Sequence, residues 1–101
     1  MQTRAIVIDE KDNVATVIGE VKAGEEVPLT GAGEGTIKVL SDVPFGHKIA
    51  LRPIAAGEQV IKYAHSIGTA TADIKPGEHV HVHNMESNRG RGDLAAKGSE
   101  R

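Results

Sequence analysis

Hydrophobic and polar residues alternate along short stretches of the chain, and glycines, prolines or charged residues separate these stretches. Side chains at every second residue of a strand share a face, so this alternation is typical of strands with one buried face. No stretch carries the sustained 3.6-residue apolar period of an amphipathic helix. The pattern therefore predicts an all-β fold of bent hairpins. The expected strands are Arg4–Ile8, Val14–Ile18, Val27–Thr30, Thr36–Leu40, Lys48–Leu51, Gln59–Tyr63, Ile67–Ala72 and Glu78–His83.

The apolar composition strengthens this prediction. Valine and isoleucine together number 19, against 4 leucines. β-Branched side chains lose rotamer freedom in helices and pack well on a pleated surface. Twelve glycines and four prolines supply frequent turns. The core is expected to contain Ile6, Ile8, Val17, Val39, Ile49, Val60, Ile67, Val80 and Val82.

One short sequence occurs three times: VKAGEEV at 21–27, IAAGEQV at 54–60 and IKPGEHV at 74–80. Each copy has an apolar residue, two spacers, Gly-Glu, one variable residue and valine. This order predicts an apolar anchor, a turn in which glycine relieves the backbone, and the start of a new strand. The irregular spacing between copies favours one small domain over a solenoid.

The character of the sequence changes at Met85. Residues 85–101 contain Met85 and Leu94 as their only sizeable apolar side chains, too few to order the segment by burial. We therefore expect a domain at 1–84 and a flexible tail at 85–101, with a weak helical turn at Asp93–Lys97. Alternatively, the tail is a docking arm in which Arg89 and Arg91 pair with carboxylates of a partner.

Composition and charge limit the function classes. The chain has 101 residues and a formal net charge of −2, so it lacks the basic field typical of proteins that bind nucleic acid or membrane surfaces. Phe45 and Tyr63 are its only aromatic residues, too few for a base-stacking platform. It has no cysteine, no signal-like start and no apolar run of membrane-spanning length. We expect a cytoplasmic, soluble protein without nucleic-acid or membrane partners.

The segment EHVHVHN at 78–84 places His79, His81 and His83 at alternate positions. In a strand, the three imidazoles would share one face. This face is interpreted as a metal site, as a solvated surface, or as a polar patch facing a substrate or partner. Same-face neighbours lie roughly 7 Å apart, whereas zinc binds nitrogen at ~2.0–2.1 Å. No metal ligand is therefore expected in this chain.

Two further segments carry basic side chains next to turns. FGHKIAL at 45–51 contains His47 and Lys48, and VIKYAHSIG at 60–68 contains Lys62 and His65. In a regular strand His47 and Lys48 point to opposite faces. Lys48 and Lys62 are either ordinary exposed lysines or cations placed to bind an anionic substrate.

The segment Val43–Asn84 closely resembles the small, N-terminal domain of the altronate/galactarate dehydratase family, which includes the sulfolactate sulfo-lyase small subunit. The elements GHKIAL, IKY, IG-AT and GEHVHVHN carry the resemblance together, and it extends over essentially Met1–Asp93. Members of this family often have glycine at the position of Ala64. The resemblance implies an SAF-type domain with a β-clip fold.

The resemblance also implies a lyase that acts on a hydroxy or sugar acid and releases water, or sulfite in the sulfo-lyase branch. In this family a large catalytic part, fused or separate, carries the metal, expected to be iron or manganese. This chain would then be a stand-alone small subunit or an excised domain. The expected partner is a large dehydratase subunit, and a homo-oligomer is left open.

β-Elimination next to a carboxylate needs a base, an electrophile for the enolate-like charge and an acid for the leaving group. A face rich in histidine and lysine can supply an acid and a carboxylate clamp. We therefore expect His81, His83 and His47 to be catalytic, and Lys48, Lys62 and Asn84 to bind substrate. The alternatives are a sulfolactate sulfo-lyase small subunit, a stand-alone sugar-acid-binding module, and a structural domain that holds an oligomer together.

Overall fold

The computed structural model describes residues 3–87, which form nine strands and no helix. The all-β prediction is confirmed. Within these residues no helix is long and apolar enough to cross a membrane. The predicted helical turn in the tail lies outside the described residues. The strands are β1 (Arg4–Val7), β2 (Val14–Ile18), β3 (Glu26–Gly31), β4 (Thr36–Lys38), β5 (Lys48–Ala50), β6 (Gln59–Lys62), β7 (His65–Ala70), β8 (His79–Val80) and β9 (Met85–Ser87).

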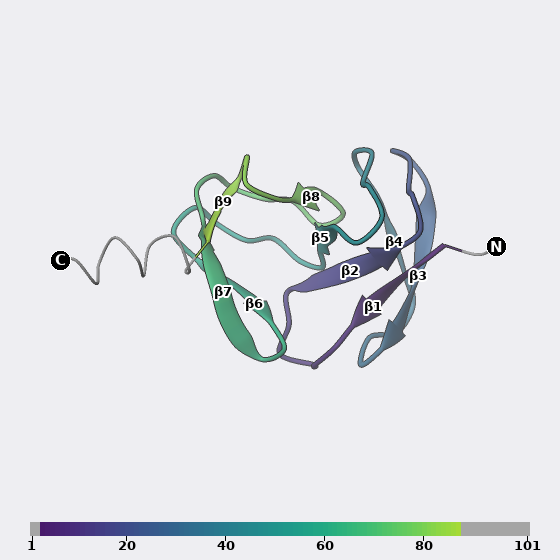
Figure 1. Ribbon diagram of the computed structural model, residues 1–101, viewed down its shortest axis with the longest axis horizontal. Coiled ribbons are helices and arrows are strands. Elements are labelled where there is room, and N and C mark those ends of the chain that lie inside the picture. The colour runs from purple at the N-terminus through teal and green to yellow at the C-terminus, as the bar shows by residue number, and fades with distance from the viewer. Residues whose placement is uncertain (1–2, 88–101) are drawn as a thin grey trace, which may run out of the picture.

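The strands form two curled sheets, visible on opposite sides of Figure 1. The larger sheet has the order β4-β3-β1-β2-β5-β8, and the smaller has the order β6-β7-β9. All pairs are antiparallel except β1 with β3. Strands β5 and β8 lie between the two halves of the molecule. This central position makes the β5–β8 pair the framework of the site described below.

Two apolar clusters form the core, one in each half. Valine, isoleucine and alanine fill both, as β-branched enrichment predicts for pleated surfaces. Val17 and Ile49 are fully buried in the first cluster, and Val60 and Val80 are fully buried in the second. The first cluster contains Ala5, Val7, Ala15, Val17, Val21, Val27, Val39, Val43 and Ile49, and the second contains Val14, Ala50, Ile54, Val60, Ala70, Ile74 and Val80.

The predicted burial is wrong for two of the expected core residues. Ile8 is 43% exposed because β1 ends at Val7 and the chain turns away there. Val82 is 76% exposed because it lies in a turn and not in a strand. Ile6 and Ile67 are half-buried. The remaining five residues are buried as expected: Val17, Val39, Ile49, Val60 and Val80.

The repeated sequence forms the same turn wherever it occurs, and the structure contains a fourth copy at 43–49. In every copy the glycine has positive φ, and the next residue donates its N–H to the carbonyl three residues earlier. In the fourth copy, the residue after Gly46 is His47 instead of glutamate. The turn therefore delivers His47 to the start of β5. The four donor–acceptor pairs are Glu25 to Lys22, His47 to Pro44, Glu58 to Ala55 and Glu78 to Lys75.

The predicted strand at Glu78–His83 is wrong in its second half. Strand β8 contains only His79 and Val80, and residues 81–84 form a turn. The chain then enters β9, which pairs with β7 through Thr69 and Glu86. The first three residues of the segment expected to be a tail thus form a strand. Residues 88–101 lie outside the described part.

A buried carboxylate fixes the hairpin between β6 and β7. Asp12 is 1% exposed and accepts N–H bonds from Asp9, Tyr63 and Ala64. Tyr63 and Ala64 have φ values of 57° and 63°, which non-glycine residues seldom adopt. The bonds from Tyr63 and Ala64 hold this strained turn in place, and the bond from Asp9 fixes the carboxylate that accepts them. Because the turn follows directly after β6, these bonds also fix the backbone at Lys62, the last residue of that strand.

Candidate functional site: a histidine cluster beside two lysines

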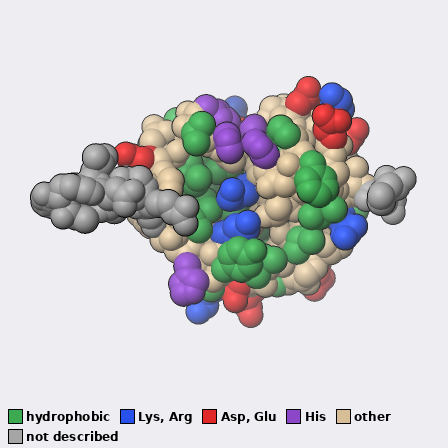
Figure 2. Space-filling view, viewed as in Figure 1, with side chains coloured by type: hydrophobic (Ala, Val, Ile, Leu, Met, Phe, Trp, Pro, Cys, Tyr) green, Lys and Arg blue, Asp and Glu red, His purple; other side chains and the backbone are tan. Residues whose placement is uncertain are grey.

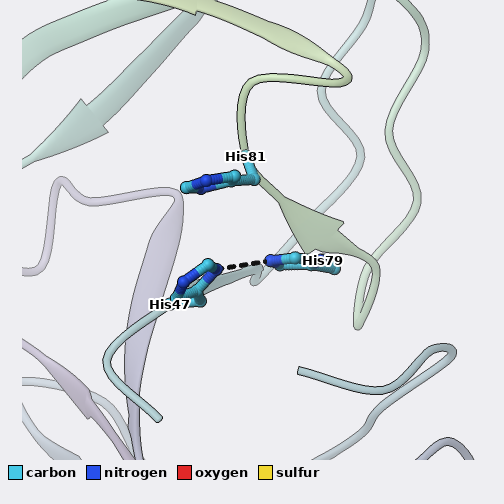
Figure 3. Close-up of side chains that lie close together, drawn as sticks. All are labelled: His47, His79 and His81. Carbon is cyan, nitrogen blue, oxygen red and sulfur yellow. Dashed lines mark hydrogen bonds between the residues drawn. The ribbon is translucent and has the colours of Figure 1, made fainter. Parts of the chain in front are cut away.

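Four of the five histidines gather at the β5–β8 pair. His47 precedes β5, His79 lies in β8, and His81 and His83 follow in the turn. Antiparallel pairing places Ile49 opposite His79 and Lys48 opposite Val80, so the start of β5 lies beside the end of β8. This pairing joins residues more than thirty positions apart. Figure 3 shows the rings of His47, His79 and His81 facing a common space.

The imidazole rings are in direct contact. Nδ1 of His47 lies 2.9 Å from Nε2 of His79, a hydrogen bond in which one nitrogen carries the proton. The rings of His47 and His81 are stacked with centroids 4.3 Å apart. His83 adjoins His79 with a centroid distance of 5.3 Å. The candidate ligand atoms of His47, His79 and His81 all lie within 4.8 Å of one another, so these residues could hold a metal ion.

Asn84 holds the turn that directs these side chains. Its Oδ1 accepts the N–H of His81 at 3.0 Å, and its Nδ2 donates to the carbonyl of His79 at 2.9 Å. Its own N–H donates to the carbonyl of His81. Asn84 is 3% exposed, and both of its side-chain bonds are partly buried. A buried amide bonded to the backbone on both sides favours a positioning role over the substrate contact expected from the sequence.

The cluster brings several basic side chains close together. Burial, together with the charges of His47, His83, His81 and Lys48, lowers the pKa of His79 to about 4. Burial, followed by His47, Lys48 and His83, also lowers the pKa of His81. His79 is therefore neutral at pH 7 in the free chain. One of its two ring nitrogens then carries a lone pair that can accept a proton or bind a metal.

Two lysines extend the site. Lys48 is half-buried, and burial and the nearby charge of Lys62 lower its pKa. The Nζ of Lys62 lies 5.0 Å from the ring centroid of Tyr63, a cation–π contact that restrains the side chain. Figure 2 shows histidine side chains gathered on one part of the surface and Lys or Arg side chains in the middle of the same face. Two amines held close together favour an anion between them.

A groove of 540 Å³ opens beside His79 and His83. Three acidic side chains line it, and one oxygen of each accepts a backbone N–H: Asp42 from Ala23, Asp73 from Ala56, and Glu78 from Lys75. These carboxylates stabilise the repeated turns and make the groove unfavourable for an anionic ligand. The better candidate site is therefore the surface that we call the histidine–lysine face, formed by His47, His79, His81, His83, Lys48 and Lys62. The groove lining is Leu40, Ser41, Asp42, Asp73, Lys75, Glu78, His79 and His83.

The structure brings together most of the residues that the sequence singled out. The three expected catalytic histidines, His47, His81 and His83, all lie in the cluster. Lys48 lies close enough to influence the histidines electrostatically, and Lys62 influences Lys48 in turn. His79, absent from the expected site residues, is a central member. His79 belongs to the cluster because β5 pairs with β8 and because Asn84, five residues later, bonds to its carbonyl. Of these two causes, only Asn84 can be recognised in the nearby sequence.

The chain matches the family model described as the altronate/galactarate dehydratase SAF domain over residues 3–88. It is 45% identical over 83 residues to an altronate dehydratase of Escherichia coli and 40% identical over 83 residues to one of Bacillus subtilis. Each match covers 82% of this chain but only 16% of the dehydratase.

A third relative is of similar length to this chain. The (2R)-sulfolactate sulfo-lyase subunit alpha of Chromohalobacter salexigens is 42% identical over 90 residues, which cover 83% of this chain and 94% of that subunit. The relatives of this chain named above are thus lyases. In them this unit is either a small part of a long chain or nearly a whole subunit. Because the family model spans most of the sequence, the chain belongs to the altronate/galactarate dehydratase SAF domain family.

Proposed function

We propose that this chain is the small domain or subunit of a cytoplasmic hydro-lyase acting on sugar acids, and that its histidine–lysine face completes an active site held by a larger catalytic chain. One observation carries the proposal: the same unit covers 16% of two altronate dehydratases and 94% of a sulfo-lyase subunit. A unit that occurs both within a long chain and as a separate small subunit is best explained as a part that works with a larger one.

The site chemistry supports this role. Elimination next to a carboxylate needs a proton donor for the leaving group and a positive charge near the carboxylate. Lys62 and Lys48 would bind the carboxylate. His81, His83 and His47 would exchange the proton. Burial and neighbouring positive charges keep the pKa of His81 low in the free chain, and an anionic substrate would oppose this effect and favour the protonated form.

The large part would supply the remaining chemistry. The histidine–lysine face offers imidazoles and amines. Among the described residues, no carboxylate belongs to the cluster. We propose that the large part holds a divalent metal, iron or manganese, as the family resemblance implies. We propose that the metal there stabilises the enolate-like charge, while this chain orients the substrate and handles the leaving group.

A second candidate is the small subunit of a sulfolactate sulfo-lyase. The 94% coverage of the Chromohalobacter subunit favours it, because that relative corresponds in length to this chain. The face would then hold a sulfonate as well as a carboxylate, both of which are anions suited to the two lysines. A stand-alone sugar-acid-binding module is the third alternative.

Reconstitution tests these alternatives. The chain would be mixed with a large subunit of the dehydratase or sulfo-lyase type, and turnover of altronate, galactarate and (2R)-sulfolactate would be measured. We expect no turnover by the chain alone and turnover of one substrate by the complex. Turnover by this chain alone would overturn the subunit proposal. Tight binding of a sugar acid without any association with the large subunit would favour the independent module instead.

A further inference from the structure

The imidazoles of His47, His79 and His81 are placed as ligands to a single ion. We propose that these three residues form a metal site for a first-row divalent transition ion such as Zn²⁺ or Fe²⁺, with at least one coordination position left open. The site lies within this small chain and is separate from the metal expected in the large part. It does not depend on the proposed function.

The nitrogen positions support the site. Ligands bound to one ion at ~2.0–2.1 Å place their nitrogens roughly 3–3.4 Å apart. His47 Nδ1 and His79 Nε2 are already 2.9 Å apart, and the candidate atoms of all three residues lie within 4.8 Å of one another. The short contact between two ring nitrogens needs a shared proton when no ion is present. A metal ion would take the place of that proton, and a small rotation of the His81 ring would complete the set.

The objection raised by the sequence does not apply to this arrangement. Same-face residues of one regular strand are too far apart, roughly 7 Å, to meet at one ion with ease. In the structure β8 ends at Val80, and the turn that Asn84 holds brings His81 back toward His79. His47 comes from the paired element and not from β8. Two separate backbone segments thus supply the three ligands.

Ligand chemistry decides which ion fits. Imidazole suits zinc, iron, cobalt, nickel and copper, whereas magnesium and calcium prefer oxygen ligands. Three neutral imidazoles leave the full positive charge of the ion on the complex, and they favour an anionic group in the open position. A hydroxy acid offers such a group in its carboxylate. The nearby Lys48 opposes a second cation, so the affinity is expected to be lower than in sites with a carboxylate ligand.

In the metal-bound form the three imidazoles would act as ligands, and His83 would remain as the free imidazole of the cluster. Its ring lies 5.3 Å from that of His79, measured between centroids, so it stays next to the ion. This arrangement of three protein ligands with an open position is the one that catalytic zinc sites use.

Metal titration of the isolated 101-residue chain tests the site directly. The protein is produced without a histidine tag, stripped with a chelator and titrated with Zn²⁺ by calorimetry and with Co²⁺ by visible absorption. We expect one ion per chain and Co²⁺ bands typical of low-coordinate nitrogen ligation. Mg²⁺ should not compete. The matched control is His65→Ala, which removes the exposed histidine of β7.

The variants make the result decisive. We expect His47→Ala, His79→Ala and His81→Ala each to weaken Zn²⁺ binding by more than about 100-fold, since losing even an outer-shell partner of a ligand costs 10–100-fold. His65→Ala should bind as the wild type does. Circular dichroism verifies that each variant is folded, and the Co²⁺ spectrum of the wild type tests ligation without any variant. The proposal is overturned if the wild-type chain binds neither ion, or if His65→Ala weakens binding as much as the cluster variants.

Discussion

Nδ1 of His47 lies 2.9 Å from Nε2 of His79, although 32 residues separate them in the sequence. The pairing of β5 with β8 brings these two rings together, and the glycine turn before β5 delivers His47 to the right end of its strand. The contact joins two of the four segments that carry the family resemblance, GHKIAL and GEHVHVHN. It gives those separate motifs a common location in the fold.

The Asn84 side chain should be essential for this geometry. Replacing Asn84 with alanine removes the acceptor for His81 N–H and the donor to the His79 carbonyl. Leaving buried backbone groups unpaired costs about 1–3 kcal/mol. Urea unfolding should show this loss for Asn84→Ala. Asn84→Asp, which keeps the acceptor, should lose less. A change below about 0.5 kcal/mol for Asn84→Ala would contradict the positioning role.

Much of the fold could be predicted because strand signals are local. Val14–Ile18 has the predicted bounds, and the other strands up to β7 begin and end within two residues of the predicted bounds. Alternation and turn residues act over a few positions, so the sequence displays them directly. The fourth copy of the turn escapes the sequence pattern because His47 replaces the glutamate that defines the other three copies.

The site was predictable in its residue types but not in its geometry. Three alternate histidines suggest a flat strand face, whereas the chain leaves β8 after Val80 and turns back. The signal for this turn is Asn84, whose short amide can bond backbone groups nearby. The site residues expected from the sequence omit His79, yet the structure places it at the centre of the cluster. Only long-range strand pairing could have placed His47 beside it.

The turn at Tyr63 and Ala64 predicts a stabilising substitution. Ala64 has a φ of 63°, a conformation that costs a residue with a Cβ roughly 1–2 kcal/mol. Ala64→Gly should raise the free energy of unfolding by about 0.5–1 kcal/mol, after the entropy that glycine adds to the unfolded chain is deducted. Ala56→Gly, in an exposed turn without positive φ, should not stabilise. Equal effects of the two substitutions in urea unfolding would show that strain at Ala64 is negligible.

The low pKa of His79 predicts how stability depends on pH in the metal-free chain. Because this pKa is about 4 in the folded chain and 6.5 for an unperturbed histidine, the unfolded chain binds the proton first as pH falls. The stability that depends on a neutral His79 is fully present above pH 6.5 and is lost progressively as the pH falls toward 4. Urea unfolding with chelator present should show this loss, and His79→Gln should have a shallower slope than either wild type or His65→Gln. Parallel slopes for all three proteins would argue against the shift.

Lys62 should act on substrate binding in the assembled enzyme. Its amine is held near the Tyr63 ring and close enough to Lys48 to lower the pKa of that lysine. If Lys62 contacts the substrate carboxylate in the ground state and the transition state alike, Lys62→Ala should raise KM by about 10-fold and leave kcat nearly unchanged. Lys22→Ala, at an exposed turn, is the matched control. A fall in kcat with constant KM would assign Lys62 a different role.

Turnover by the reconstituted complex tests the central claim, that the histidine cluster forms part of a lyase active site. His81→Ala, His83→Ala and the control His65→Ala would be compared at matched occupancy of the large subunit. Loss of a proton donor typically costs about 10²–10⁴-fold in rate. We predict a loss of this size for His81→Ala and His83→Ala and a wild-type rate for His65→Ala. Wild-type rates for both cluster variants would contradict the account and leave the cluster as a surface feature.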